Sequence, residues 1–170
     1  KRCVHTALEG FAKKTPQEQA LCARFVVIGG GATGVEVASE VMTIGRELLT
    51  QQGIDAGVLH VDLIEALPRL MTMLPESMSA KIDQRLRSLG VNVLLNTAVQ
   101  SVEESVVHLK ESDVRAKTIF WPAGIKGPAL HASIKELALD KRGRAMVDAQ
   151  LRAQGQSHVF AIGDGAATPY

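Results

Sequence analysis

The sequence predicts an α/β fold with helices packed on a parallel sheet. Short apolar runs at residues 25–28 and 58–65 are each typical of a buried strand, and helical periodicity returns after each of them. From residue 91 the period changes to alternation, which predicts further short strands. Alternation of strands and helices favours a sheet covered by helices. At 170 residues the chain has room for one domain and part of another.

The helices are expected in a regular order along the chain. An apolar face over residues 2–14 predicts a first helix, and Thr-Pro-Gln-Glu at 15–18 predicts the start of a second. Residues 33–51 predict a long helix with two apolar stripes, so its second side is covered either by a neighbouring domain or by a wide core. A helix from residue 77 ends at Gly90.

The remaining segments read as strands and turns. Later strands are predicted at residues 91–95, 98–102, 106–109 and 117–121. The middle two form an antiparallel hairpin joined near residues 103–105, and Pro122 ends the last strand at Trp121. Two further extended runs are expected at 143–148 and at 158–162, the second of them buried. Methionines in the connector 67–75 are expected to serve packing and not chemistry.

A glycine-rich turn follows the first strand and opens the long helix. Gly29, Gly31 and Gly34 have the spacing G-x-G-x-x-G. The first glycine permits a tight turn, the second lets a pyrophosphate approach the backbone, and the third lets the helix lie close to the strand. The helix start presents unpaired N–H groups to an anion. The candidate cofactor-binding residues here are Gly29, Gly30, Gly31, Ala32, Thr33 and Gly34.

An acid at the end of the second strand completes this pattern. Glu65 stands where a dinucleotide fold has the acceptor for the adenosine ribose hydroxyls, whereas Asp62 lies within the strand. A carboxylate at this point repels a 2′-phosphate, which favours NAD(H) over NADP(H). Arg69 is close in sequence and weakens that preference. The alternative for Glu65 is a solvated acid at a strand end.

Composition excludes several classes of protein. A net charge of +1 and 4% aromatic residues offer no nucleic-acid surface. No apolar stretch is as long as a membrane span, and the first residues have no signal-peptide core. Cys3 and Cys22 are expected to be buried, reduced thiols. The five histidines pair with no cysteine or acid at ligand spacing, so no metal site is predicted.

The order of these motifs resembles the type II NADH dehydrogenases, which are FAD-dependent members of the pyridine nucleotide-disulfide oxidoreductase superfamily. The resemblance covers most of residues 24–167 and rests on VVIGGGATGVEVASE, DLIEALPRLM, GVNVLLNTAVQSVE, IFWPAGIKGPAL, RGRAMVD and HVFAIGDGAA. It implies that the glycine turn holds the NAD pyrophosphate, that Glu65 binds the ribose and that Gly124 closes a turn beside NAD. It also implies that Glu36 lies near the nicotinamide and flavin as the candidate catalytic residue. Glu36 is equally well read as a helix acid in the first turn, where the helix dipole favours it.

The resemblance further implies a flavin. Gly163 and Asp164, in the AIGD pattern, match the residues that hold the ribityl chain of FAD, although Asp164 also suits a simple turn. Gly165 and Pro122 depart from the family's usual residues, and no second G-x-G-x-x-G is present. Most of the FAD site and the quinone-site region therefore lie outside this sequence, and we expect the chain to be a piece of a longer protein.

These inferences predict a Rossmann-like NAD-binding domain, with a parallel sheet, helices and a β-meander crossover, followed by a short remnant of an FAD-binding domain. The expected divisions are a helical connector at 1–22, the NAD(H)-binding domain at 23–124 and the return segment at 125–170. The fragment is expected to bind NADH without turnover. In the whole protein, hydride passes from NADH to FAD and electrons pass on to a quinone.

Partners, location and alternatives follow from the same resemblance. The expected location is the cytoplasm, peripheral on the inner face of the cytoplasmic membrane through the absent C-terminal region, with no nucleic acid and with a homodimer left open. A second interpretation is a disulfide- or ferredoxin-type flavoprotein reductase. A third is a non-enzymatic nicotinamide-sensing module, which leaves the AIGD segment unexplained.

Overall fold

The chain forms two compact units, Lys1–Ala123 and Gly124–Tyr170. The computed structural model describes residues 2–169 except Gly10 and Ile125. Ile125, where the sequence predicts the domain boundary, thus lies outside the described residues. Within the part of the chain that the structure describes, no helix has the length and apolar character needed to cross a membrane.

Two short helices begin the first unit, α1 (Arg2–Leu8) and α2 (Pro16–Cys22), with a 3-10 turn at Phe11–Lys13 between them. The predicted start of α2 is confirmed, because Thr15 and Glu18 form a capping box in which each side chain accepts the backbone N–H of the other. The N–H of Thr15 is the main cause that lowers the pKa of the Glu18 carboxyl. This small stabilisation is present above the ordinary pKa and is lost as the pH falls through the lowered value.

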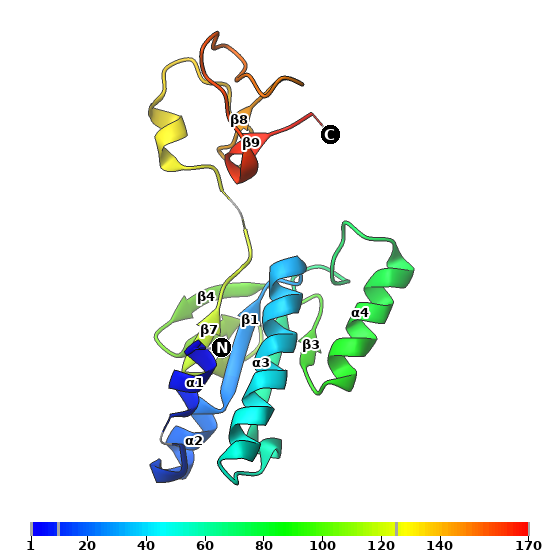
Figure 1. Ribbon diagram of the computed structural model, residues 1–170, viewed down its shortest axis with the longest axis vertical. Coiled ribbons are helices and arrows are strands. Elements are labelled where there is room, and N and C mark those ends of the chain that lie inside the picture. Colours follow the sequence, from blue (N-terminus) through cyan, green and yellow to red (C-terminus); the bar gives the residue numbers. More distant parts are fainter. Residues whose placement is uncertain (1, 10, 125, 170) are drawn as a thin grey trace. The chain divides into compact units, whose positions relative to one another are not determined.

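The core of this unit is a parallel sheet in the order β3-β2-β1-β7 (Figure 1). Helices and a second sheet cover its two faces, and the apolar run of the central strand β1 is buried on both of them, as the sequence predicts. Strand β2 starts later than the expected residue 58 because Ala56–Val58 form a 3-10 turn. The strands are β1 (Arg24–Ile28), β2 (His60–Ile64), β3 (Asn92–Leu94) and β7 (Thr118–Phe120).

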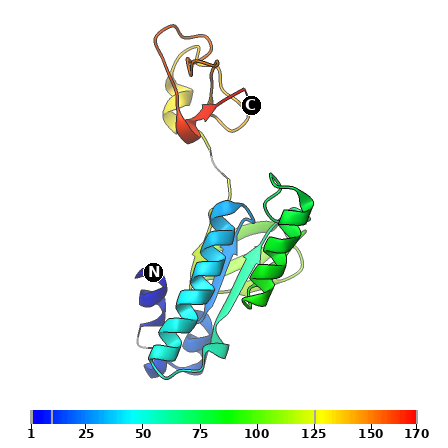
Figure 2. The same cartoon turned by 45° about the vertical axis from the view of Figure 1, so that its right-hand side comes forward.

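Helices α3 (Ala32–Gln51) and α4 (Glu76–Ser88) lie side by side on one face of the sheet (Figures 1 and 2). One stripe of α3, which includes Ala38, is buried in the core. Its second stripe, which includes Val37, lines a small pocket together with Val4 of α1. The N-terminal helix of the same unit therefore provides the second cover that the broad apolar surface of α3 predicts.

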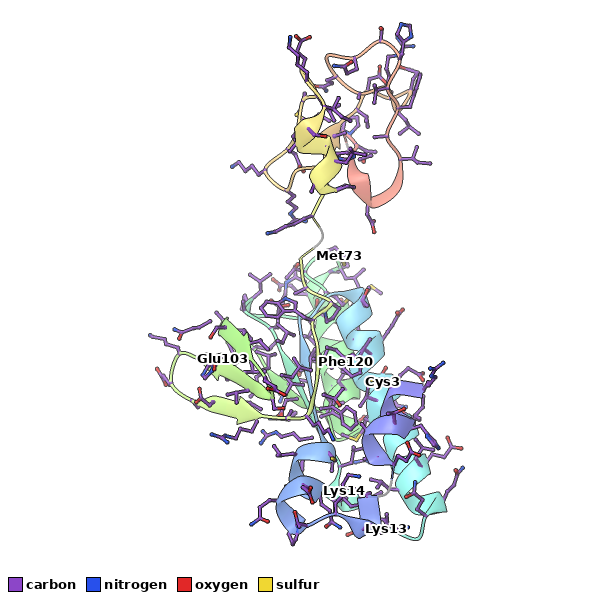
Figure 3. All side chains as sticks on the ribbon, turned by 90° about the vertical axis from the view of Figure 1, so that its left-hand side faces the viewer. Cys3, Lys13, Lys14, Met73, Glu103 and Phe120 are labelled. Atoms are coloured by element: carbon purple, nitrogen blue, oxygen red, sulfur yellow. The ribbon has the colours of Figure 1, made fainter. Side chains whose placement is uncertain are left out.

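A three-stranded antiparallel meander covers the opposite face, with Glu103 at the end of its first strand (Figure 3). It consists of β4 (Val99–Glu103), β5 (Val106–Leu109) and β6 (Asp113–Arg115). The hairpin of β4 and β5 is confirmed, and β6 is an addition. Strand β6 has a single apolar residue between two charged ones, so alternation cannot reveal it. The core between meander and sheet contains Val26, Ile28, Ile64, Val107, Val114 and Ala116.

The second unit contains little regular structure. Strands β8 (Ala145–Met146) and β9 (Ala166–Ala167) pair in parallel, with 3-10 turns at Ala129–Ser133 and Gly163–Gly165. The predicted buried strand at 158–162 is wrong. Only an isolated bridge joins Arg152 to Phe160, and the side chains of Phe160 and Ile162 are 59% and 74% exposed. Apolar composition alone suggested burial there.

Candidate functional site

The glycine turn between β1 and α3 leaves almost no room except at one position. A Cβ on Gly34 would lie 1.8 Å from the carbonyl oxygen of Gly29, so only glycine lets α3 approach the turn this closely. Gly29 itself has φ +116° and donates its N–H to the Ile64 carbonyl at 2.8 Å. Around Gly31, in contrast, a Cβ would meet no atom within 4 Å. The open side of the turn is therefore at Gly31.

The open position coincides with the start of α3. Gly31 is the N-cap residue, it has no side chain to cap the helix, and Gly31, Ala32 and Thr33 are all exposed. Backbone N–H groups in the first turn of a helix have no partner within the helix. They and the positive end of the helix dipole face the open side, where an anion is stabilised.

Glu65 lies directly against this turn. One carboxylate oxygen, Oε2, accepts the N–H of Gly30 at 2.6 Å, and the other, Oε1, accepts the N–H of Leu67 at 2.8 Å. The side chain is half-buried, so it is not a freely solvated acid at a strand end. Each oxygen keeps a second lone pair that remains available to a ligand hydroxyl.

A loop that sequence reasoning treated as a mere connector also contacts the turn. The N–H of Met71 donates to the carbonyl of Gly30 at 2.8 Å, and the side chain of Leu70 packs on Gly30. Met71 is partly buried, as expected, but Met73 is 73% exposed and lies at the surface (Figure 3). The prediction that the loop methionines pack is therefore wrong for Met73. The sequence carries no local signal for the contact of the loop with the turn, since Ser79, the polar residue of α4 that is buried beneath the loop, is an ordinary helix residue by its sequence position.

Comparison with known proteins identifies the family. The family model described as pyridine nucleotide-disulphide oxidoreductase matches residues 2–169. The chain belongs to the pyridine nucleotide-disulphide oxidoreductase family. It is similar to a type II NADH:quinone oxidoreductase of Haemophilus influenzae, with 32% identity over 162 residues, which are 94% of this chain and 36% of that relative. The chain thus spans about a third of the length of the curated relatives it matches.

Solved structures agree on the fold. The structure of NDH2 from Plasmodium falciparum in complex with NADH superposes with a TM-score of 0.82 at 22% identity, over 96% of this chain and 36% of that one. A ferredoxin reductase from Rhodopseudomonas palustris superposes with a TM-score of 0.67 at 22% identity, over 89% of this chain and 36% of that one. The parallel sheet, helices and meander of this chain therefore share the fold of these two oxidoreductases.

The other residues singled out in the sequence lie in different places. Glu36 is exposed on α3, and the first turn of that helix contains no acid, so the reading of Glu36 as a first-turn acid is wrong. Gly124 has φ +80°, a conformation that favours glycine, and it belongs to the second unit. Gly163 and Asp164 are exposed in a 3-10 turn of that unit.

Asp62 is a structural acid. It is 3% exposed, accepts the Nε of Arg24 at 2.8 Å and the Nδ2 of Asn92 at 2.7 Å, and thereby ties β1, β2 and β3 together. Because these contacts use the Asp62 carboxylate within the sheet, they agree with the choice of Glu65 over Asp62 as the candidate acceptor for the ribose hydroxyls.

We expect Asp62→Ala to lower the free energy of unfolding by about 1–3 kcal/mol, because two hydrogen bonds are lost while Arg24, whose side chain is 38% exposed, can be rehydrated. Denaturant unfolding measures this loss. Nucleotide affinity of the folded variant should equal that of the wild type. A large specific loss of affinity would instead place Asp62 in the site.

The cysteines and histidines add no further site. Cys22 is buried as expected, but Cys3 is exposed, so the prediction of two buried thiols is wrong for Cys3. His108 places Nδ1 2.8 Å from the Oδ1 of Asp113 on the meander. Among the residues that the structure describes, no three histidines, cysteines or acids gather at metal-binding distance.

Proposed function

We propose that the first unit binds NADH at the glycine turn. The observation that carries this proposal is the combination of open space at Gly31, uncapped N–H groups at the start of α3 and the Glu65 carboxylate against the same turn. The first two suit a pyrophosphate, and the carboxylate suits a ribose hydroxyl. The residues of this unit that we assign to the nucleotide are Gly29, Gly30, Gly31, Ala32, Thr33, Gly34 and Glu65.

NADH is favoured over NADPH by the same geometry. Glu65 holds two backbone N–H groups as a carboxylate, and a 2′-phosphate on the ribose would bring negative charge against it. Arg69, the cation nearest in sequence, donates to Leu74, Ser79 and Thr72 within its own loop. These three hydrogen bonds hold the guanidinium within its loop and α4, which supports the preference for NADH.

For the whole protein we infer an FAD-dependent NADH dehydrogenase that passes electrons to a quinone. The support is the 32% sequence identity with the Haemophilus influenzae NADH:quinone oxidoreductase over 94% of this chain. When bound, FAD supplies the ring that accepts hydride. The residues of this chain bind and orient the nicotinamide nucleotide, and Glu36 is the proposed catalytic residue near the nicotinamide.

The second unit, with Gly163 and Asp164, is proposed to be the returning part of the flavin-binding domain. Asp164 is one exposed acid in a short turn, and it cannot retain FAD alone. The isolated chain is therefore proposed to bind NADH without oxidising it. We also propose that the whole protein acts at the inner face of the cytoplasmic membrane, with the quinone and membrane contacts made outside this chain.

Fold similarity does not choose the electron acceptor, because a ferredoxin reductase shares the same architecture. A reductase that acts on a ferredoxin or a disulfide is therefore the second candidate for the whole protein. Supplying the full-length protein with NADH and either a soluble quinone or a ferredoxin distinguishes the two. Reduction of ferredoxin alone would overturn the quinone proposal.

The proposed binding is tested by titrating the purified chain with NADH and with NADPH. We expect NADH to bind at least about tenfold more tightly, since a 2′-phosphate loses a hydrogen bond to a charged group and meets an unpaired like charge. The absorption spectrum should show no flavin and the chain should not reduce a quinone. Equal or tighter NADPH binding contradicts the role of Glu65, and stoichiometric flavin contradicts the proposed division of the FAD site.

A further inference from the structure

We propose that Arg69 and Ser79 are positioning residues for the nucleotide. Together with the loop 67–74 that they hold, they form what we call the clasp, which fixes the carbonyl side of the glycine turn at Gly30. This inference rests on the proposed NADH binding and adds to it a set of residues outside the glycine motif.

The clasp grips Gly30 in two ways. The N–H of Met71 donates to the Gly30 carbonyl at 2.8 Å. A Cβ on Gly30 would lie 2.5 Å from Cδ2 of Leu70, which is 1% exposed, so the Leu70 side chain rests directly on the turn. Glu65 holds the N–H of the same residue at 2.6 Å. Both backbone groups of Gly30 are thus held by the segment that follows β2, and Gly31 next to it is the open position.

Arg69 and Ser79 hold the loop in turn. The Arg69 guanidinium donates from Nη1 to the Leu74 carbonyl and to the Ser79 hydroxyl, both at 2.8 Å, and from Nη2 to the Thr72 carbonyl at 2.9 Å. The Ser79 hydroxyl is 2% exposed and donates to the Leu70 carbonyl at 2.7 Å. One guanidinium and one hydroxyl therefore satisfy carbonyls on both sides of Met71.

Met71 itself needs this support. Its φ is 48°, a left-handed conformation that residues with a side chain rarely adopt. Such a conformation persists when the surroundings fix it, and it is frequent at ligand sites. Here it turns the Met71 N–H toward Gly30, so loss of the Arg69 and Ser79 contacts should release both the conformation and the hydrogen bond to the turn.

The clasp also bears on nucleotide choice. Three of the five N–H donors of the Arg69 guanidinium are used by acceptors of the loop and of α4, which hold its plane in place, whereas a guanidinium free to turn would attract a 2′-phosphate. Arg69 therefore acts on NADH by positioning the turn and not by charge. Two variants that leave the charge unchanged separate these roles, because Ser79→Ala removes no charge and Arg69→Lys keeps it.

The experiment compares Arg69→Ala, Arg69→Lys and Ser79→Ala with the wild type, and uses Arg85→Ala, an exposed arginine of α4, as the matched control for lost charge. Dissociation constants for NADH and NADPH are measured with thermal unfolding and with hydrogen exchange of the Met71 amide. We expect each clasp variant to weaken NADH about five- to tenfold, as for one lost hydrogen bond to the turn. Without ligand, the Met71 amide should exchange faster in each clasp variant than in the wild type. The double variant Arg69→Ala/Ser79→Ala should bind NADH no more weakly than the single variants do. Arg85→Ala should change nothing.

Three results would overturn the proposal. Unchanged NADH affinity in folded Arg69→Lys and Ser79→Ala is one, and unchanged exchange of the Met71 amide is another. A loss confined to NADPH would make Arg69 a phosphate ligand. If the wild type binds no NADH at all, the proposed function fails, whereas the exchange of Met71 still decides whether the clasp exists.

Discussion

Gly34→Ala is expected to abolish measurable NADH binding and to lower the free energy of unfolding by about 3 kcal/mol or more. The added Cβ would lie 1.8 Å from the Gly29 carbonyl oxygen, which is backbone and cannot swing aside as a side chain does. Helix α3 must therefore lift from the turn, and the N–H groups at its start move with it. Denaturant unfolding and NADH titration measure the two losses.

Gly31→Ala is the matched control because it separates binding from folding. The residue has φ −76°, which any amino acid adopts, and a Cβ there meets nothing within 4 Å. The free energy of unfolding should fall by no more than about 1 kcal/mol, the difference between glycine and alanine as an N-cap. NADH affinity should nevertheless fall at least about tenfold, since the methyl group occupies the space assigned to the pyrophosphate. If this variant binds NADH with wild-type affinity, the assignment of the pyrophosphate to the space at Gly31 is wrong.

These two glycines also show how a sequence can predict a candidate site. The motif spacing encodes backbone requirements, an absent Cβ at Gly34 and an open approach at Gly31, that are local to one turn and one helix start. The acid Glu65 could be predicted because strand ends of a parallel sheet meet at one edge. Long apolar segments such as α3 and the central strands were likewise legible from periodicity alone.

The features that the sequence did not predict depend on contacts between distant residues. The clasp needs a hydroxyl on α4 to meet a guanidinium ten positions earlier, and no local pattern records that contact. Strand β6 is defined by its pairing with β5 and not by its own three residues. The prediction of a buried strand at 158–162 is wrong because it rests on a local pattern: the segment is apolar in composition, but Phe160 and Ile162 are exposed.

Glu65→Gln is expected to weaken NADH by about 1–3 kcal/mol, a factor of roughly five to a hundred and fifty, if a charged acceptor for the ribose is lost. The structure adds a second source of loss. The carboxylate gives one oxygen to Gly30 and the other to Leu67, whereas an amide has one oxygen and turns its NH₂ toward the other N–H. The variant therefore disturbs both the turn and the ligand contact, and a single affinity cannot divide them.

A cycle on the ligand side divides them. Wild type and Glu65→Gln are each titrated with NADH and with the analogue that lacks the 2′-hydroxyl of the adenosine ribose. If Glu65 accepts that hydroxyl, the analogue binds the wild type more weakly than NADH does, and the difference largely disappears in the variant. If the difference persists in the variant, Glu65 acts only by holding Gly30 and Leu67. The preference for NADH would then need another cause, because the carboxylate would stabilise the glycine turn without contacting the ribose.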